Sequence, residues 1–271
     1  MKVTRLTSAL ALMAATIAPQ FAQAQAYELA VEAEVLEGWR GQDGRHIAAV
    51  RFKLKDGWKT YWRSPGDGGI PPRFNWSGSR NVRALDVAWP TPEVYHQDGM
   101  TSLGYEHEVI VPVVIEPKRT NKDIVLKGQL EIGVCKDICV PETLSVTARL
   151  HGEGAKIDPS ISVALTDQPY SADEAGVEQV TCKMSPTQDG MQVDARIQMP
   201  SSGGREFSVI ETENPLLWVS EATTRRSGNT LHVSSEVIHV DDQPFLLDRS
   251  GLRITVLGGK YAVDIQGCSA G

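Results

Sequence analysis

Apolar and polar residues alternate along most of the chain after residue 26. Ala48, Val50, Phe52 and Leu54 occupy every second position of one such run. A period of two places one set of side chains on a buried sheet face and the other set in water, so the run predicts a strand. Similar runs predict strands at 27–36, 109–115, 124–132, 144–150, 191–199, 231–238, 252–257 and 261–265.

The segments between these runs are rich in turn-forming residues. Examples are Gly-Gln-Asp-Gly at 41–44, Ser-Pro-Gly-Asp-Gly-Gly at 64–69 and Ser-Ser-Gly-Gly at 201–204. Many short strands separated by such turns are typical of β-sandwiches. We therefore predict an all-β protein.

One short helix is predicted between two groups of strands. Asp158 can cap its N-terminus, Pro159 suits the first helical position, and Ile161, Ala164 and Leu165 share a face. The surrounding polar stretch has the character of a connection. We predict a first β domain at 27–155, a linker at 156–169 and a second β domain at 170–271.

The first 24 residues have the pattern of a secretory signal peptide. Lys2 and Arg5 precede an apolar run at 9–17, and Ala-Gln-Ala at 22–24 fits the cleavage pattern, with a second such site ending at residue 26. An uncleaved anchor is disfavoured because a membrane span needs ~20 apolar residues. We therefore expect an exported protein in the periplasm that does not span the membrane when mature.

The charge balance narrows the classes of partner. Without Lys2 and Arg5 the chain has 25 basic and 34 acidic residues, a formal charge of −9. Binding of nucleic acid rests on clustered Lys and Arg, so nucleic acid is not expected as a partner. The six histidines lack metalloprotease spacing, and the chain has neither a Gly-x-Ser-x-Gly elbow nor a phosphate-binding Gly loop.

Two of the four cysteines, Cys135 and Cys139, are separated by only three residues. A small ring adds little stability, so their chemistry is of more interest than their crosslink. Three interpretations remain open: a structural hairpin disulfide, a dithiolate site for a soft metal, and a redox pair that exchanges with partners through mixed disulfides.

The other two cysteines, Cys182 and Cys268, lie near the two ends of the second predicted domain. A bridge between them would close a long loop and stabilise by ~4 kcal/mol on the chain-entropy model. We predict a structural disulfide, with a second exchange pair or two free thiols as the alternatives.

Several motifs of the first predicted domain resemble, in order, the N-terminal periplasmic domain of the DsbD family of thiol-disulfide interchange proteins. They are Asp-Gly-Trp-Lys-Thr-Tyr-Trp-Arg at 56–63, Trp-Pro at 89–90, Tyr-His-Gln-Asp-Gly-Met at 95–100, Gly-Tyr at 104–105 and Gly-Val-Cys through Cys-Val-Pro-Glu-Thr at 133–143. The resemblance covers roughly residues 30–150. Two tandem β domains resemble the branch of the family that is associated with copper sensitivity, the ScsB type.

The resemblance implies an immunoglobulin-like fold and a relay of reducing equivalents to or from thioredoxin-like periplasmic proteins, fed by a membrane-embedded electron donor. The activity would be that of a protein-disulfide reductase without a cofactor, linked to copper tolerance or to cytochrome c maturation. Cys135 and Cys139 match the reversible disulfide, and Cys139 matches the cysteine that enters mixed disulfides.

The resemblance also implies a cap over this pair. Asp98, Gly99, Met100, Thr101 and Ser102 match the cap loop. We expect this loop to shield the sulfurs, and Asp98 to raise the thiol pKa by its charge. Met100 stands where relatives have an aromatic residue, and its flexible side chain can still shield sulfur by apolar contact.

Two further expectations concern the surroundings of the pair. Tyr61 matches an aromatic residue beside the cysteines, although an ordinary core position is an equal alternative. The glycines at 66, 68 and 69 are expected to shape the same surface.

Two rival functions remain. Cys135, Cys139 and Met100, with His96, offer soft ligands for Cu(I). A non-catalytic β-sandwich assembly module is the second rival.

Overall fold

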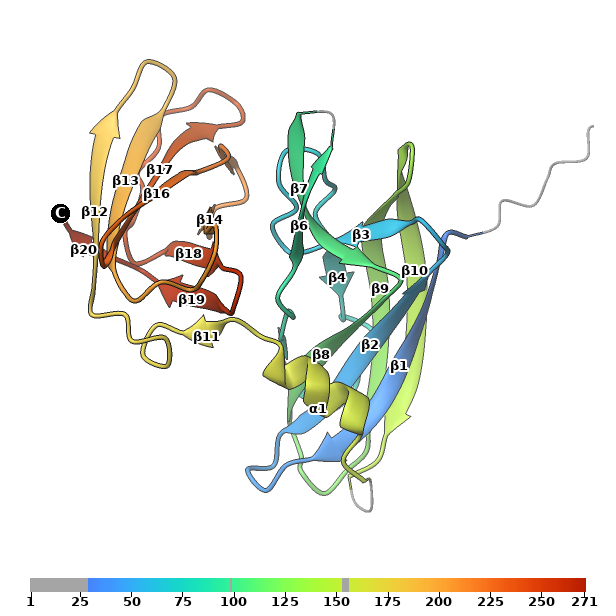
Figure 1. The fold of residues 1–271 in the computed structure, drawn as a ribbon. Helices are drawn as coiled ribbons and strands as arrows, with labels where there is room; N and C mark the ends of the chain where they lie inside the picture. Colours follow the sequence, from blue (N-terminus) through green and yellow to red (C-terminus); the bar gives the residue numbers. More distant parts are fainter. Residues whose placement is uncertain (1–28, 98, 153–155) are drawn as a thin grey trace, which may run out of the picture.

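The computed structural model describes residues 29–97, 99–152 and 156–271 (Figure 1). The described chain is nearly all β with one short helix, which confirms the predicted fold class. The predicted signal peptide at 1–24 lies outside the described residues. Within the described part, no helix has the length and apolarity needed to cross a membrane.

The first half of the chain forms two sheets that pack face to face. One sheet has the order β1 (Val31–Arg40), β2 (His46–Leu54), β8 (Glu108–Pro117) and β5 (Val82–Val87). The other has the order β10 (Cys139–Leu150), β9 (Ile124–Cys135), β3 (Lys59–Tyr61), β7 (Met100–Glu106) and β6 (Glu93–Gln97), with β4 (Arg73–Asn75) also paired to β9.

The core of this sandwich follows from the alternation in the sequence. Val50 and Phe52 of β2 and Leu130 and Ile132 of β9 are buried in one apolar cluster, together with Trp62. The charged residues between them point outward, as the period of two predicts. The even-numbered positions of β9 face the core, so its odd-numbered positions face away from the core.

The second half forms another pair of sheets with no strand shared with the first pair. One sheet has the order β11 (Tyr170–Ser171), β19 (Ala262–Gln266), β18 (Leu252–Leu257) and β14 (Phe207–Thr212). The other has the order β15 (Leu217–Val219), β17 (Thr230–His239), β13 (Met191–Gln198), β12 (Gln179–Pro186) and β20 (Ser269–Ala270), with β16 (Thr223–Ser227) also on β17.

The predicted helix is present as α1 (Pro159–Thr166) in the connection between the sandwiches. Asp158 is its N-cap, and one carboxylate oxygen accepts hydrogen bonds from the backbone N–H groups of Ser160 and Ile161. These bonds satisfy two donors that have no partner within a helix. Ile161 and Ala164 are buried, so the helix packs its apolar side on the protein.

The two sandwiches meet along β14 and the neighbouring strands of its sheet. Val209, Leu257 and Ala262 belong to the same buried apolar cluster as the core of the first sandwich. Figure 1 shows β14 on the side of the second sandwich that faces β6 and β7. The second sandwich therefore lies against the part of the first that carries the predicted cap.

Candidate redox site

Cys135 and Cys139 lie at the end of the β9–β10 hairpin. Cys135 is the last residue of β9, Cys139 is the first of β10, and the two are directly opposite each other. They form a disulfide with a Cα–Cα distance of 4.2 Å. Cys135 occupies an odd-numbered position of β9, and directly paired residues share a face of the sheet. The disulfide therefore lies on the face that points away from the core.

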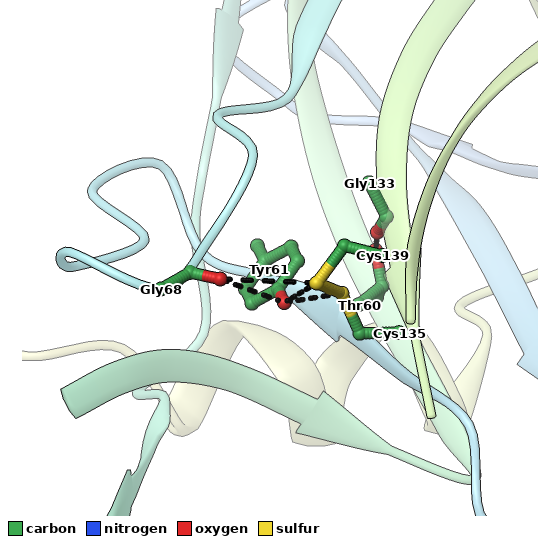
Figure 2. The surroundings of a disulfide bond; sticks show 6 residues. All are labelled: Thr60, Tyr61, Gly68, Gly133, Cys135 and Cys139. Carbon is green, nitrogen blue, oxygen red and sulfur yellow. Dashed lines mark hydrogen bonds between the residues drawn. A yellow bond between two sulfur atoms is a disulfide. The ribbon is translucent and has the colours of Figure 1, made fainter. Parts of the chain in front are cut away.

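Tyr61 of the neighbouring strand β3 covers this disulfide, as Figure 2 shows. Its ring lies between two glycines. A Cβ added to Gly69 would lie 2.8 Å from ring atom Cδ1, and one added to Gly133 would lie 3.0 Å from Cδ2. The absence of side chains at Gly69 and Gly133 therefore makes room for the ring beside the sulfurs.

The Tyr61 hydroxyl contacts both sulfurs and one backbone carbonyl. Its oxygen lies 2.6 Å from Cys135 Sγ, 3.2 Å from Cys139 Sγ and 3.3 Å from the Gly68 carbonyl oxygen. A disulfide sulfur carries no proton, so the hydroxyl is the donor, and Cys135 Sγ is its nearest acceptor. Burial raises the pKa of Tyr61 above its usual value of 10.0, which keeps this donor protonated.

The two sulfurs differ in their exposure to solvent. Cys135 is only 7% exposed, whereas Cys139 is exposed. Exchange requires a thiolate to approach one sulfur of the disulfide in line with the S–S bond. In such an attack Cys139 would be the accessible target, and Cys135 would be the leaving group beside the Tyr61 hydroxyl.

The predicted cap is a β-hairpin. Gln97 of β6 pairs with Met100 of β7, and Gly99 in the turn has a φ of 80°, which favours glycine. Asp98, to which we assigned an effect on the thiol pKa, lies outside the described residues. Met100 is 54% exposed at the tip of the hairpin.

Met100 lies next to Gly68, and Gly68 is the residue that approaches the disulfide. A Cβ added to Gly68 would lie 3.6 Å from Met100 Cβ and 3.9 Å from its sulfur, and the Gly68 carbonyl oxygen lies 3.9 Å from Cys139 Sγ. Thr101 is buried and Ser102 lies opposite Tyr95 within the sheet, so these two residues form part of strand β7.

A second segment, besides the β6–β7 hairpin, belongs to the surroundings of the disulfide and reaches it directly. This segment, residues 64–70, is called here the glycine loop; its Gly68 and Gly69 touch the site as described. The sequence indicated that its glycines shape this surface. It gave no indication of Gly133, whose role depends on which ring packs against it.

The remaining predicted copper ligand, His96, has other partners. Its Nδ1 lies 3.1 Å from the Thr101 hydroxyl oxygen, and its ring packs edge-on against Phe207 at a centroid distance of 6.5 Å. Within the described residues, no group of three or more His, Cys, Asp and Glu side chains is arranged to hold a metal ion.

Cys182 and Cys268 are joined by a disulfide in the second sandwich. Cys182 is fully buried, and the bridge lies where β12 pairs with β20, the C-terminal strand. It therefore fastens the last strand to the sheet and offers a thiolate no approach to Cys182.

A β-sandwich with a disulfide at a hairpin end, one sulfur buried beside a tyrosine hydroxyl and the other exposed, fits the class of thiol-disulfide interchange modules. The comparisons agree with this class. The family described as "Thiol:disulfide interchange protein DsbD, N-terminal" matches residues 14–150, and the chain belongs to that family. No curated protein matches the chain.

Solved structures show a similar architecture. The N-terminal periplasmic domain of ScsB from Proteus mirabilis is 20% identical, with a TM-score of 0.62, and the match covers 89% of this chain and 92% of that domain. At this identity the similarity shows the fold, and it extends over both sandwiches. A second structure, BspA_C_WT, is 7% identical over 86% of this chain and 97% of that one, and its TM-score of 0.19 indicates no shared fold.

Proposed function

We propose that this protein relays reducing equivalents in the periplasm through reversible opening of the Cys135–Cys139 disulfide. The unequal exposure of the two sulfurs carries this proposal, with Tyr61 placed on the buried one. A crosslink that served stability alone would need neither an exposed sulfur nor a hydrogen-bond donor at the other. The partners are thioredoxin-like proteins, and a membrane-embedded protein is the source of electrons.

The exchange proceeds in two steps that balance. A partner thiolate attacks Cys139 Sγ, a mixed disulfide forms, the Cys135–Cys139 bond breaks, and its electron pair leaves on Cys135 as a thiolate. The Tyr61 hydroxyl stabilises this thiolate by a charge-assisted hydrogen bond. A second partner thiol then displaces Cys139, so the partner dithiol is oxidised and the pair is reduced.

The reverse sequence delivers electrons. The Cys139 thiolate attacks the disulfide of an acceptor, and Cys135 resolves the mixed disulfide. The Gly68 carbonyl oxygen lies 3.9 Å from Cys139 Sγ in the disulfide form, so a small shift would let it accept a hydrogen bond from the Cys139 thiol once the pair is reduced. Links to copper tolerance or to cytochrome c maturation would follow from the identity of the acceptor.

Trapping tests this proposal directly. In Cys135→Ser the Cys139 thiolate still attacks the disulfide of an oxidised partner, but Cys135 can no longer resolve the mixed disulfide. Adducts that form on Cys139 should therefore accumulate and can be identified by mass spectrometry once free thiols are blocked. Cys139→Ser is the matched control, because it leaves only the buried sulfur. Capture of a thioredoxin-like protein by Cys135→Ser but not by Cys139→Ser is the expected result.

Failure to form any adduct, together with a Cys135–Cys139 disulfide that resists mild reductant, would instead support an assembly module.

Binding of Cu(I) is the second candidate, and the position of Met100 beside Gly68 favours it because a thioether is a soft ligand. Titration of the reduced protein would then show tight binding of one equivalent, which is lost in Met100→Leu.

A further inference from the structure

We propose that strand β14 of the second sandwich positions both the glycine loop, which approaches the Cys135–Cys139 disulfide through Gly68, and the β6–β7 hairpin that packs on this loop. Glu211 of β14 holds the start of the glycine loop through Arg63, and Phe207 of β14 supports the β6–β7 hairpin through His96. The inference rests on the proposed exchange function, because a cover matters only to a disulfide that reacts.

The contact at Arg63 is a two-pronged ion pair between the sandwiches. Arg63 Nε donates to Glu211 Oε1 at 3.1 Å, and Nη2 donates to Glu211 Oε2 at 3.0 Å. Nη2 also lies 2.9 Å from the Thr255 hydroxyl oxygen and 3.9 Å from Asp264 Oδ1. The guanidinium carbon lies 3.8 Å from the ring centroid of Trp62, which fixes the plane of the fork.

This ion pair is well shielded from water. The side chains of Arg63 and Glu211 are 12% and 19% exposed. Burial lowers the pKa of Arg63, and the charge of Glu211 opposes that shift. Removing one partner of a buried pair is costly because it leaves the other charge without compensation. The two parallel hydrogen bonds of such a pair also fix its orientation. Arg63 thus has one well-defined position against β14.

Arg63 directly precedes the glycine loop and is tied to β7. The backbone N–H of Trp62 donates to the Leu103 carbonyl at 3.0 Å, and the Leu103 N–H donates to the Pro65 carbonyl at 2.9 Å. Three residues after Pro65, the Gly68 carbonyl reaches Tyr61 and Cys139. A displacement at Arg63 is therefore transmitted along a few residues to the atoms over the disulfide.

The second contact supports the hairpin that carries Met100. Phe207 packs edge-on against the His96 ring, and His96 is hydrogen-bonded to Thr101 next to Met100. The hairpin and the glycine loop also touch each other, because a Cβ added to Gly66 would lie 2.5 Å from the Thr101 carbonyl oxygen. The hairpin and the glycine loop therefore act as one unit with two supports on β14.

Between these supports the glycine loop borders a cavity. A space of about 710 Å³ separates it from the second sandwich, lined on one side by Asp67 and Gly69 and on the other by Glu211 and Trp218. The loop is held at Arg63 but has room to move away from the disulfide toward this cavity. Weakening the contacts on β14 should therefore loosen the cover.

The test is the rate at which dithiothreitol reduces Cys135–Cys139 in the full chain at pH 7. One thiolate of the reagent attacks Cys139 and displaces Cys135, and its second thiol closes the oxidised ring and releases Cys139. Differential alkylation and peptide mass spectrometry report this pair separately from Cys182–Cys268. We expect Glu211→Gln to speed reduction by roughly 2- to 30-fold, the range of couplings through a contiguous network.

Two further variants use the same assay. Arg63→Lys keeps the charge but loses the fork, so it should also speed reduction, and the double variant Arg63→Lys/Glu211→Gln should be no faster than the faster single one. Phe207→Leu tests the second support independently, with a smaller increase expected, and it serves as the test should Glu211→Gln fail to fold.

Glu206→Gln is the matched control. Glu206 forms a similarly buried two-pronged pair with Arg226, at 2.6 and 2.8 Å, entirely within the second sandwich. Unchanged rates in Glu211→Gln and Phe207→Leu, or an equal increase in Glu206→Gln, would overturn the proposal. Reduction by a small reagent needs no partner, so this result is separable from failure of the relay, which trapping alone would reveal.

Discussion

The Tyr61 hydroxyl is expected to accelerate opening of the disulfide, and Tyr61→Phe isolates its contribution. The ring stays between Gly69 and Gly133, so the substitution removes one oxygen and leaves the cover in place. What is lost is the donor 2.6 Å from Cys135 Sγ. Because this sulfur leaves as a thiolate, the hydrogen bond gains strength as the S–S bond breaks.

The size of the effect follows from the charge on the leaving sulfur. A hydrogen bond to a charged group contributes about 1.5–3 kcal/mol. If about half of that is present in the transition state, where the sulfur is partly charged, reduction slows by about 4- to 12-fold. In the dithiol state the same hydrogen bond stabilises the Cys135 thiolate, so its loss should raise the pKa of the Cys135 thiol.

Both quantities are measurable in the assay with dithiothreitol and by alkylation of the reduced protein across pH. Tyr95→Phe is the control, since the Tyr95 hydroxyl donates to Glu93 at the surface of the same sheet and is not bonded to either sulfur. A rate in Tyr61→Phe equal to that of the wild type would refute the role of the hydroxyl as a donor. A faster rate would show that the hydroxyl shields the sulfurs instead.

Three other predictions concern the support of the site and the second sandwich. Gly133→Ala, whose Cβ would lie 2.5 Å from Ile70 Cβ, should cost about 1–3 kcal/mol of stability and displace Tyr61, seen as a lower Tm with an altered rate of reduction. Replacing both Cys182 and Cys268 by serine opens a bridge with a sequence separation of 86 and should cost about 2–5 kcal/mol by chemical denaturation, while leaving trapping on Cys139 intact. Burial opposes ionisation of Glu206, but hydrogen bonds from Arg226 and Ser202 outweigh it and hold its pKa below the usual 4.5. The stabilisation is therefore complete above pH 4.5 and lost as pH falls through the lowered value, so the Tm difference between wild type and Glu206→Gln should shrink on acidification.

Most of the strands that the sequence predicted have one buried face and one more exposed face. The alternation at 48–54 became β2, with Val50 and Phe52 buried. Strand β14 was not predicted, because both of its faces are covered and its sequence Phe-Ser-Val-Ile-Glu-Thr has no period of two. The cap that the sequence predicts as a loop is part of the β6–β7 hairpin, for which Asp-Gly at 98–99 is a strong local signal.

Some residues of the site could be predicted from local sequence motifs, whereas others depend on contacts between distant parts of the chain. The cysteines and Tyr61 stand in short motifs, so their resemblance to known proteins was sufficient to propose them. Glycine at 133 serves the site only because a ring from another strand fills its space, and no local pattern reports such a contact. The ion pair of Arg63 and Glu211 joins residues 148 positions apart and depends on how two sandwiches meet.

The position of the disulfide explains why its reactivity depends more on the segments around it than on the geometry of the two cysteines. Cys135 and Cys139 are paired residues of a regular hairpin, held by the ladder of β9 and β10, so their geometry has little freedom to change between encounters. The one helix among the described residues, α1, lies in the connection between the sandwiches, so it does not supply a helix N-terminus to the pair. Reactivity toward different thiols must therefore be set by what lies above the pair, and those segments are held from the second sandwich. A second sandwich that only extended the chain would not need a buried arginine fork beside the redox site.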